Sequence, residues 1–185
     1  ITLACALDRK IKGEPIWIFN VAPPGNTKTE ILRSLEDGEM FYQLSTLSSN
    51  SMISGYVKPN GEKVEDLAEQ LNNKILIIKD FTSILTMNKD KREEIIGQLR
   101  DAYDGYINRK LGNIDKKIGH KCSFGLIAGV TPVIDKHYKI MGQLGERFLK
   151  LRVNYDDDKI VNQADLNEGK EKEMREEITA LIMGF

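Results

Sequence analysis

Two runs of almost wholly apolar residues restrict the possible folds more than any other feature of this sequence. One is Ile75–Ile78, which leads into Lys79 and Asp80, and the other lies within residues 123–130. Because neither run alternates apolar with polar residues, each predicts a strand buried on both faces of a sheet. Three more strands are predicted from shorter runs, at 16–21, 40–44 and 148–153.

Helices are predicted between these strands, at 1–11, 28–35, 63–71 and 88–104. The last is the clearest, because Asn88 can cap its first turn and Gly105 can end it. Residues 106–121 predict a β-hairpin. We therefore expect an α/β protein of three layers, αβα, in which helices cover both faces of a mainly parallel central sheet.

The composition is that of an ordinary globular protein, with 41% hydrophobic and 30% charged residues. A formal net charge of −1 gives no overall field for nucleic acid or anionic membranes, so such contacts would need a local basic patch. Cys5 and Cys122 show no pairing pattern, and no signal peptide or membrane-spanning run is evident. We expect a cytoplasmic protein without membrane contacts.

Residues 22–29 carry the most informative motif. They follow the first strand, precede a helix and read Ala-Pro-Pro-Gly-Asn-Thr-Lys-Thr. The phosphate-binding motif of P-loop proteins, G-x-x-x-x-G-K-[ST], has the same setting, and its backbone N–H groups bind phosphate oxygens. We expect Lys28 to reach the β- and γ-phosphates of ATP and the Thr29 hydroxyl to bind Mg²⁺. The residues expected around the nucleotide are Pro24, Gly25, Asn26, Thr27, Lys28 and Thr29.

Both glycines of this motif are replaced. Ala22 stands for the first, where one added methyl group is a mild change. Thr27 stands for the second, where the backbone passes close to the phosphates and a β-branched side chain competes for their space. The alternative interpretation is a proline–glycine turn that merely begins a helix, and the motif alone does not decide between the two.

Two later strand ends carry polar side chains that such a site needs. Asp80 follows an apolar strand, as does the Walker B acid that holds Mg²⁺ through water. The next residue is Phe81 rather than the Glu that often orients the attacking water. Thr131 ends the strand at 123–130, where related folds sense the γ-phosphate. A solvated Asp and a Thr-Pro strand end are the ordinary alternatives.

Five segments in succession resemble one group of proteins: 22–30, 77–85 (IIKDFTSIL), 98–105 (QLRDAYDG), 126–132 (LIAGVTP) and 145–149 (GERFL). In their order and spacing, over about residues 1–183, they resemble the AAA+ related P-loop ATPase domains of phage, plasmid and mobile-element replication proteins. Those domains are similar to the helicase half of primase–helicases and, more distantly, to superfamily-three and minichromosome maintenance helicases.

The resemblance implies a P-loop ATPase core over residues 1–155 and a C-terminal helical segment over 156–185, the start of a lid or linker. Because the chain opens without methionine and ends in a helical stretch, we expect it to be a piece of a longer protein. Catalytic roles are implied for Lys28, Asp80 and Thr131, with Mg²⁺ held by Thr29 and Asp80.

Arg147 matches the arginine finger that reaches the nucleotide of the next subunit, which implies a homo-oligomer, such as a hexameric ring. Arg152 is a second candidate for this role, and a surface salt bridge with Glu146 is the alternative for Arg147. The water-activating base is not identified by any motif. Suggestions for it are Asp104, Glu30 and Glu39.

A locally basic segment precedes the strand at 123–130, and Asp115 is its only acid. In the helicases that the chain resembles, a hairpin at this position grips DNA in the ring pore, and its cations make binding salt-dependent. The cations assigned here to contacts with single-stranded or forked DNA are Arg109, Lys110, Lys116 and Lys117. An ordinary solvated hairpin is the equal alternative.

Three further features of the sequence are weaker indications of function. Residues 54–57 are a second pore candidate through Tyr56, although we slightly favour Tyr56 packed under its own loop. Residues 156–158 are three aspartates that lack calcium-loop spacing and predict a solvated helix start. His120 and Cys122 form one H-x-C pair without a partner motif, so no zinc site is expected.

The sequence thus supports first an ATP-hydrolysing, helicase-like motor domain that acts on DNA in mobile-element replication. The second hypothesis is a degenerate P-loop fold that serves as an oligomeric nucleic-acid-binding scaffold with little turnover, as Thr27 and Phe81 suggest. The third is a small-molecule kinase, although no arginine-rich lid is evident. ATP turnover that DNA stimulates would favour the first hypothesis. DNA binding without turnover would favour the second, and turnover that depends on a small acceptor would favour the third.

Overall fold

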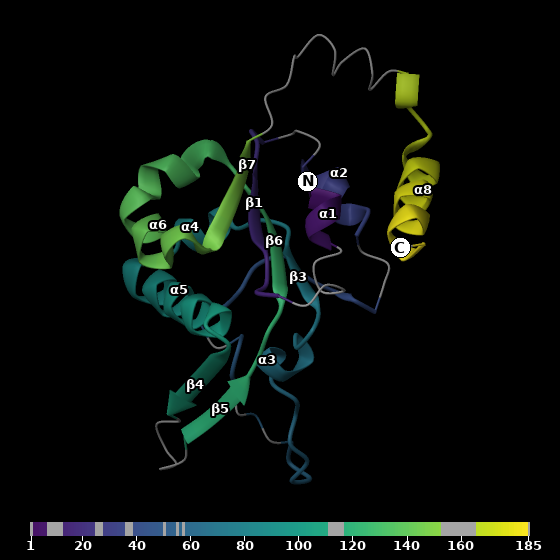
Figure 1. Cartoon of the computed structure of the whole chain (residues 1–185). Coiled ribbons are helices and arrows are strands. Elements are labelled where there is room, and N and C mark those ends of the chain that lie inside the picture. Colours follow the sequence, from purple (N-terminus) through teal and green to yellow (C-terminus); the bar gives the residue numbers. More distant parts are fainter. Residues whose placement is uncertain are drawn as a thin grey trace.

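A computed structural model describes residues 2–6, 13–24, 28–35, 39–49, 51–54, 56, 58–110, 117–152 and 166–184. Its centre is a five-stranded sheet in the order β2-β3-β6-β1-β7 (Figure 1). Every neighbouring pair in this sheet is parallel. The strands are β1 (Trp17–Val21), β2 (Phe41–Leu44), β3 (Ile75–Ile78), β6 (Gly125–Val130) and β7 (Phe148–Arg152). The expected α/β class with a mainly parallel sheet is confirmed.

Helices lie on both sides of this sheet (Figure 1). One side carries α4 (Thr82–Leu85), α5 (Lys89–Tyr103) and α6 (Tyr138–Leu144), and the other carries α1 (Thr2–Ala6), α2 (Lys28–Arg33) and α8 (Glu171–Met183). Short helical turns are α3 (Leu67–Gln70), η2 (Pro132–His137) and η3 (Gly145–Arg147). No described helix is both long enough and apolar enough to cross a membrane.

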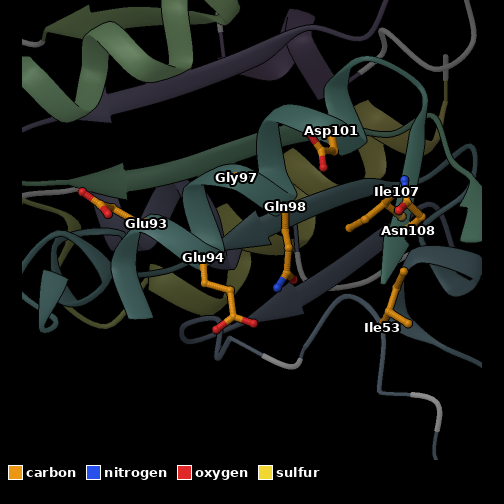
Figure 2. A pocket seen from close by; sticks show the side chains of 8 residues that line it. All are labelled: Ile53, Glu93, Glu94, Gly97, Gln98, Asp101, Ile107 and Asn108. Carbon is orange, nitrogen blue, oxygen red and sulfur yellow. The ribbon is translucent and has the colours of Figure 1, made fainter. Parts of the chain in front are cut away.

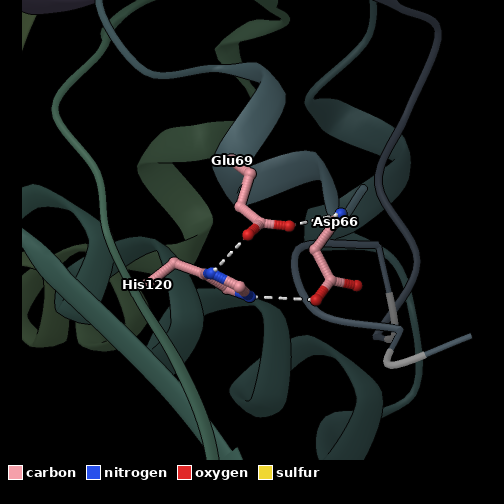
Figure 3. Close-up of side chains that lie close together, drawn as sticks. All are labelled: Asp66, Glu69 and His120. Atoms are coloured by element: carbon pink, nitrogen blue, oxygen red, sulfur yellow. Dashed lines mark hydrogen bonds and ion pairs between the residues drawn. The ribbon is translucent and has the colours of Figure 1, made fainter. Parts of the chain in front are cut away.

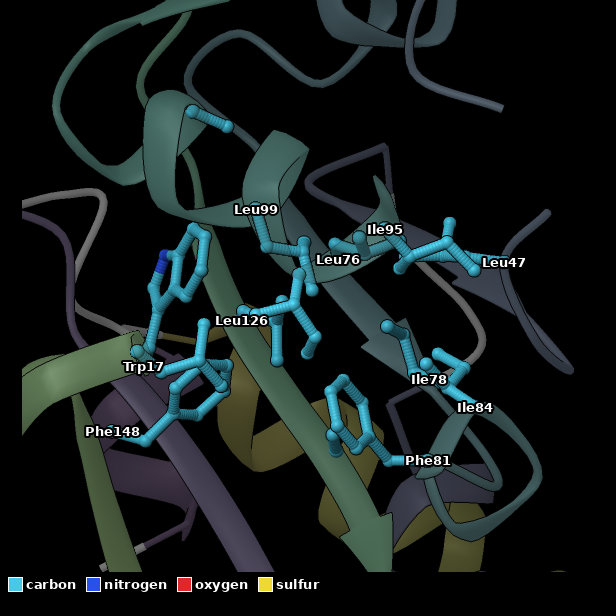
Figure 4. Close-up of a cluster of buried hydrophobic side chains, with 14 of the residues drawn as sticks. Trp17, Leu47, Leu76, Ile78, Phe81, Ile84, Ile95, Leu99, Leu126 and Phe148 are labelled. Carbon is cyan, nitrogen blue, oxygen red and sulfur yellow. The ribbon is translucent and has the colours of Figure 1, made fainter. Parts of the chain in front are cut away.

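The two faces of the sheet are packed by alternate residues of the same strands. In β3, Leu76 and Ile78 belong to the larger core with α4, α5 and α6 (Figure 4), whereas Ile75 and Ile77 join a smaller core with Cys5 of α1. All four β3 residues are fully buried. The absence of polar alternation in this run therefore follows from burial on both faces.

Helix α5 and the hairpin before β6 form as expected. The Asn88 side chain accepts the Lys91 backbone N–H at 3.0 Å, and Gly105 ends the helix with a φ of 88°. Strands β4 (Tyr106–Lys110) and β5 (Lys117–Lys121) pair antiparallel. Residues 111–116, which join the two strands in sequence, lie outside the described residues. In Figure 1 this hairpin extends away from the sheet.

The C-terminal helix α8 rests on α2 through a mixed contact. Thr179 Oγ1 donates to the Ser34 carbonyl at 3.0 Å, Arg175 pairs with Glu30, and Ile178 packs against the smaller core. Met174 and Leu181 of the same helix are 40% and 54% exposed. The aspartates at 156–158 lie outside the described residues.

Candidate nucleotide-binding site

The predicted site segments meet at one edge of the sheet because all five strands are parallel. Val21, the last residue of β1, is aligned with Val130, the last residue of β6, and Ala22 N–H donates to the Val130 carbonyl at 3.1 Å. The chain leaves β1 toward α2 and leaves β6 at Thr131. Asp80 comes shortly after β3, which pairs with β6 on the side away from β1. Ala22, Thr131 and Asp80 therefore lie at the same, carboxyl-terminal edge.

Lys28 lies against the end of β6, where Gly129 leaves room for it. A Cβ atom added to Gly129 would lie 3.6 Å from Lys28 Cε, 2.7 Å from the Lys79 carbonyl oxygen and 3.1 Å from Leu32 Cδ1. Any larger residue would thus crowd the Lys79 carbonyl and Leu32, whereas 3.6 Å is an ordinary contact with the Lys28 side chain. The first helical residue after the loop is therefore positioned at the edge that carries Asp80 and Thr131.

Thr82 joins the ends of β3 and β6, a contact that the sequence analysis missed. Its backbone N–H donates to Asp80 Oδ1 at 3.0 Å, and its hydroxyl oxygen accepts the Thr131 N–H at 3.0 Å. The two threonine hydroxyls also lie 3.2 Å apart. An Asp side chain that accepts the backbone N–H of the second residue after it forms an Asx turn. The Asp-x-Thr pattern after a strand is the sequence signal that could have predicted this turn. The bonds fix Asp80 relative to Thr131.

Two of the three residues suggested as the water-activating base already have cationic partners. Glu30 pairs with Arg33, whose Nη1 lies 2.7 Å from Oε1, and with Arg175 of α8. Asp104 binds Arg147 at the opposite edge of the sheet, and Glu39 is exposed in the turn before β2. The contacts of Glu30 and Asp104 are thus those of ion pairs, and no described contact singles out a base.

Arg147 is held inside its own chain. Its Nη2 lies 2.8 Å from Asp104 Oδ1 and 3.0 Å from Oδ2, Nη1 donates to the Leu144 carbonyl, and the guanidinium covers the Tyr103 ring at 5.5 Å. The suggested salt bridge to Glu146 is not the one formed. Arg147 precedes Phe148, which is aligned with Trp17 at the amino-terminal end of β1. It therefore lies at the edge opposite the phosphate loop of its own chain.

Arg152, the second finger candidate, lies at the same edge as the loop because it is aligned with Val21. Its Nη1 lies 2.9 Å from Asp135 Oδ2. Hydrogen bonding from Arg152, aided by its charge, lowers the pKa of the Asp135 carboxyl. Arg152 is thus paired in this state as well.

Several predicted site residues lie outside the described part of the chain. Gly25, Asn26, Thr27 and Lys116 have no described placement. Arg109, Lys110 and Lys117 belong to the hairpin strands, but their side chains lie outside the description. Thr29 is the second residue of α2 and is partly buried.

The loop that carries Tyr56 differs from expectation. Tyr56 is 56% exposed, so the favoured packing under its own loop is wrong. The carbonyl of Tyr56 accepts the Val64 N–H at 3.2 Å, which closes the loop by backbone contact and leaves the ring outside. His120 contacts Asp66 and Glu69 rather than Cys122 (Figure 3). A histidine between two acids that are distant in sequence has no local signal.

Cys122 is a buried thiol whose Sγ donates to the Ala102 carbonyl at 3.8 Å. Burial raises its pKa to about 11, so roughly one thiol in a thousand is ionised at pH 8. We predict that iodoacetamide labels neither Cys122 nor Cys5, which is also buried, in the native protein at pH 8. Mass spectrometry should detect both labels in urea, whereas rapid native labelling of Cys122 would contradict its burial.

Two described pockets lie elsewhere. The pocket in Figure 2, of about 260 Å³, lies between α5 and β4, and its lining includes Glu93, Glu94 and Asp101. These acids disfavour a phosphate ligand. A second pocket, of about 350 Å³, lies between α2 and α8 and is lined partly by Glu30, Met174 and Ile178. The arrangement at the sheet edge is therefore the better candidate for a nucleotide.

Comparison with known proteins found that no protein-family model and no curated protein matches this chain.

Proposed function

We propose that this chain is an ATP-binding and hydrolysing P-loop domain, a helicase-like motor of AAA+ type that acts on DNA. The observation that carries the proposal is a change of direction in the sheet. From β1 the chain passes through α2 to β2 on one side, and from β6 it passes through α6 to β7 on the other. Ligands of open α/β sheets bind at the carboxyl ends of such strand pairs. The loop after β1 and Thr131 after β6 flank that point.

The residues at this edge have the chemistry of phosphoryl transfer. The Lys28 ammonium would neutralise charge on the β- and γ-phosphates, and Thr131 would bind a γ-phosphate oxygen. Thr29 and Asp80 would hold Mg²⁺, which neutralises phosphate charge when it is bound. The reaction would be in-line attack of water on the γ-phosphate, favoured by positioning and by electrostatic stabilisation.

The hairpin suggests how hydrolysis would act on DNA. Strand β6 begins four residues after β5 and ends at Val130, next to Thr131. A shift of Thr131 on γ-phosphate loss would therefore pass along one buried strand to the basic hairpin. Arg109, Lys110, Lys116 and Lys117 remain the residues proposed to contact single-stranded or forked DNA. We further propose a cytoplasmic homo-oligomer.

The degenerate scaffold remains the second candidate because specific observations favour it. Thr27 replaces the glycine at the tightest part of the loop, and Phe81 follows Asp80 where an acid often stands. Arg147 is also engaged by Asp104 instead of being free to meet a neighbouring subunit. DNA binding without phosphate release would support this scaffold function.

Calorimetry with Mg-ATP separates these functions at the first step. We expect the wild-type chain to bind, Lys28→Ala to lose binding, and Thr27→Gly to bind more tightly because the loop gains space for phosphate. Lys91→Ala, which removes an exposed lysine of α5, is the matched control and should bind normally. Phosphate release with and without DNA follows for the variants that bind.

Each other result has a definite meaning. Binding by Thr27→Gly alone would favour the degenerate scaffold. If neither the wild-type chain nor Thr27→Gly bound Mg-ATP, the proposed nucleotide site would be wrong for this chain. Nucleoside diphosphate formation that requires a small acceptor would instead indicate a kinase.

A further inference from the structure

His120 lies between two carboxylates, one on each ring nitrogen (Figure 3). Its Nε2 lies 2.9 Å from Asp66 Oδ2 and its Nδ1 lies 3.1 Å from Glu69 Oε1. The His120 side chain is 10% exposed and the Asp66 side chain is fully buried. His120 belongs to β5, whereas Asp66 and Glu69 belong to the start of α3. The contact therefore joins the hairpin to a different part of the chain.

With both carboxyl groups ionised, two ring protons satisfy this geometry. Carboxylate oxygens only accept hydrogen bonds, and a neutral imidazole has one N–H and one lone pair. A neutral ring would point its lone pair at one of the two carboxylates. An imidazolium donates to both, and it also supplies the positive partner that a buried Asp66 carboxylate needs.

The remaining bonds of the two acids extend the link beyond α3. Asp66 Oδ1 accepts the Ser54 N–H at 2.8 Å and the Ser54 hydroxyl at 3.0 Å. Glu69 accepts the Asp66 N–H and the Lys63 ammonium. Burial opposes ionisation of Glu69, but the bonds from Lys63 and Asp66, with the charge of His120, lower its pKa overall.

We propose that doubly protonated His120 locks the β4–β5 hairpin to the segment 51–54, so that the basic hairpin and the Tyr56 loop move as one unit. Tyr56 is exposed, and its N–H donates to Ser54 Oγ at 3.2 Å. The lock itself does not depend on the proposed ATPase. Its consequence, a single DNA-contacting surface made of the hairpin and Tyr56, rests on that proposed function.

The charged groups around His120 support a proton rather than a metal ion as the bound species. Asp66, Glu69 and, through Glu69, Lys63 face it from the α3 side, and its aligned partner on β4 is the apolar Ile107. One ligand atom from each of the three residues lies within 4.8 Å of the others, but the carboxylates contact opposite ring nitrogens, so a metal ion would have to replace these direct contacts. A metal ion would also compete with the Lys63 ammonium for Glu69.

The first test is the charge state of His120 in the chain alone, at pH 7. The chain has two histidines, and His137 gives the internal reference. A ¹H–¹⁵N correlation spectrum of the imidazole rings should show both nitrogens of His120 with imidazolium shifts, assigned by loss in His120→Gln and retention in His137→Gln. A neutral-ring pattern for His120 would overturn the proposal.

The second test is amide hydrogen exchange in the same variants. His120→Gln should speed exchange about tenfold or more at Ser54 and at hairpin residues 117–121 together. His137→Gln should leave both segments unchanged. Acceleration of the hairpin alone, or of neither segment, would show that no lock exists.

Two additions keep the test decisive. If His120→Gln unfolds, Ser54→Ala removes one bond to Asp66 and the bond from the Tyr56 N–H, and it should still accelerate exchange in both segments. Zn²⁺ added to the wild-type chain should not raise its melting temperature. A Zn²⁺-dependent rise that is absent in His120→Gln would identify a metal site and overturn the proton lock. None of these measurements needs ATP or DNA, so failure of the lock and failure of the proposed ATPase are distinguishable.

Discussion

Phe19→Ala should lower the free energy of unfolding by about 3–5 kcal/mol. Phe19 is fully buried at the middle of β1, stacked on Phe148 with ring centroids 3.9 Å apart and edge-on to Phe81 at 4.8 Å. Truncation removes the buried ring, leaves a cavity in the centre of the sheet, and removes two aromatic contacts. The loss is a large share of the roughly 5–15 kcal/mol that holds a typical domain folded.

Urea unfolding monitored by circular dichroism measures this change. Phe19→Leu keeps most of the side-chain volume and should lose clearly less than Phe19→Ala. Tyr138→Ala removes an aromatic ring that is 69% exposed, so it should change stability by no more than about 0.5 kcal/mol. A Phe19→Ala value near that of Tyr138→Ala would show that the stacked core is wrong.

The elements that the sequence predicted well are those fixed by local pattern and by complete burial. Ile75–Ile78 forms β3 because a strand with apolar side chains on both faces needs both faces buried, here by two layers of helices. Helix α5 runs between the Asn88 cap and Gly105 because both signals act within one turn of the helix. The common edge of Ala22, Asp80 and Thr131 follows from parallel strands alone.

The contacts that the sequence did not predict join residues that are distant along the chain. Nothing near Asp104 marks it as the partner of Arg147, and nothing near His120 marks Asp66 and Glu69. For Arg147 and Asp104 the order β2-β3-β6-β1-β7, a property of the whole sheet, decides which elements meet, whereas His120 lies in the separate β4–β5 pair. Tyr56 was misjudged for a related reason, because backbone bonds rather than an apolar cover close its loop.

Arg147 has two competing roles that predict different behaviour. As an ion pair, it would tie η3 to the end of α5 through Asp104 and the Tyr103 ring. As an arginine finger, it would leave this contact to stabilise phosphoryl charge on a neighbouring subunit. Its position at the edge opposite its own phosphate loop means that it cannot serve the nucleotide of its own chain in this arrangement. A catalytic role would therefore have to be exerted in trans.

Arg147→Ala should reduce phosphate release about 10³–10⁵-fold while Mg-ATP binding in calorimetry persists. The expected cost in stability is small, about 1 kcal/mol or less, because the ion pair is partly exposed. Asp104→Asn is the matched control, since it removes the ion pair and keeps the arginine. If the ion pair alone matters, Asp104→Asn and Arg147→Ala should behave alike; if the finger matters, Asp104→Asn should keep turnover.

Mixing two inactive variants tests whether the arginine acts across an interface. An Arg147→Ala subunit retains Lys28, and a Lys28→Ala subunit retains Arg147. Where the two meet in an oligomer, one interface in the mixture combines an intact phosphate loop with an intact finger, so phosphate release should return in part. Arg147→Ala that hydrolyses ATP at the wild-type rate would contradict the finger directly. No recovery in mixed oligomers of proven composition would restrict Arg147 to its contact with Asp104, because a trans residue must be supplied by the partner.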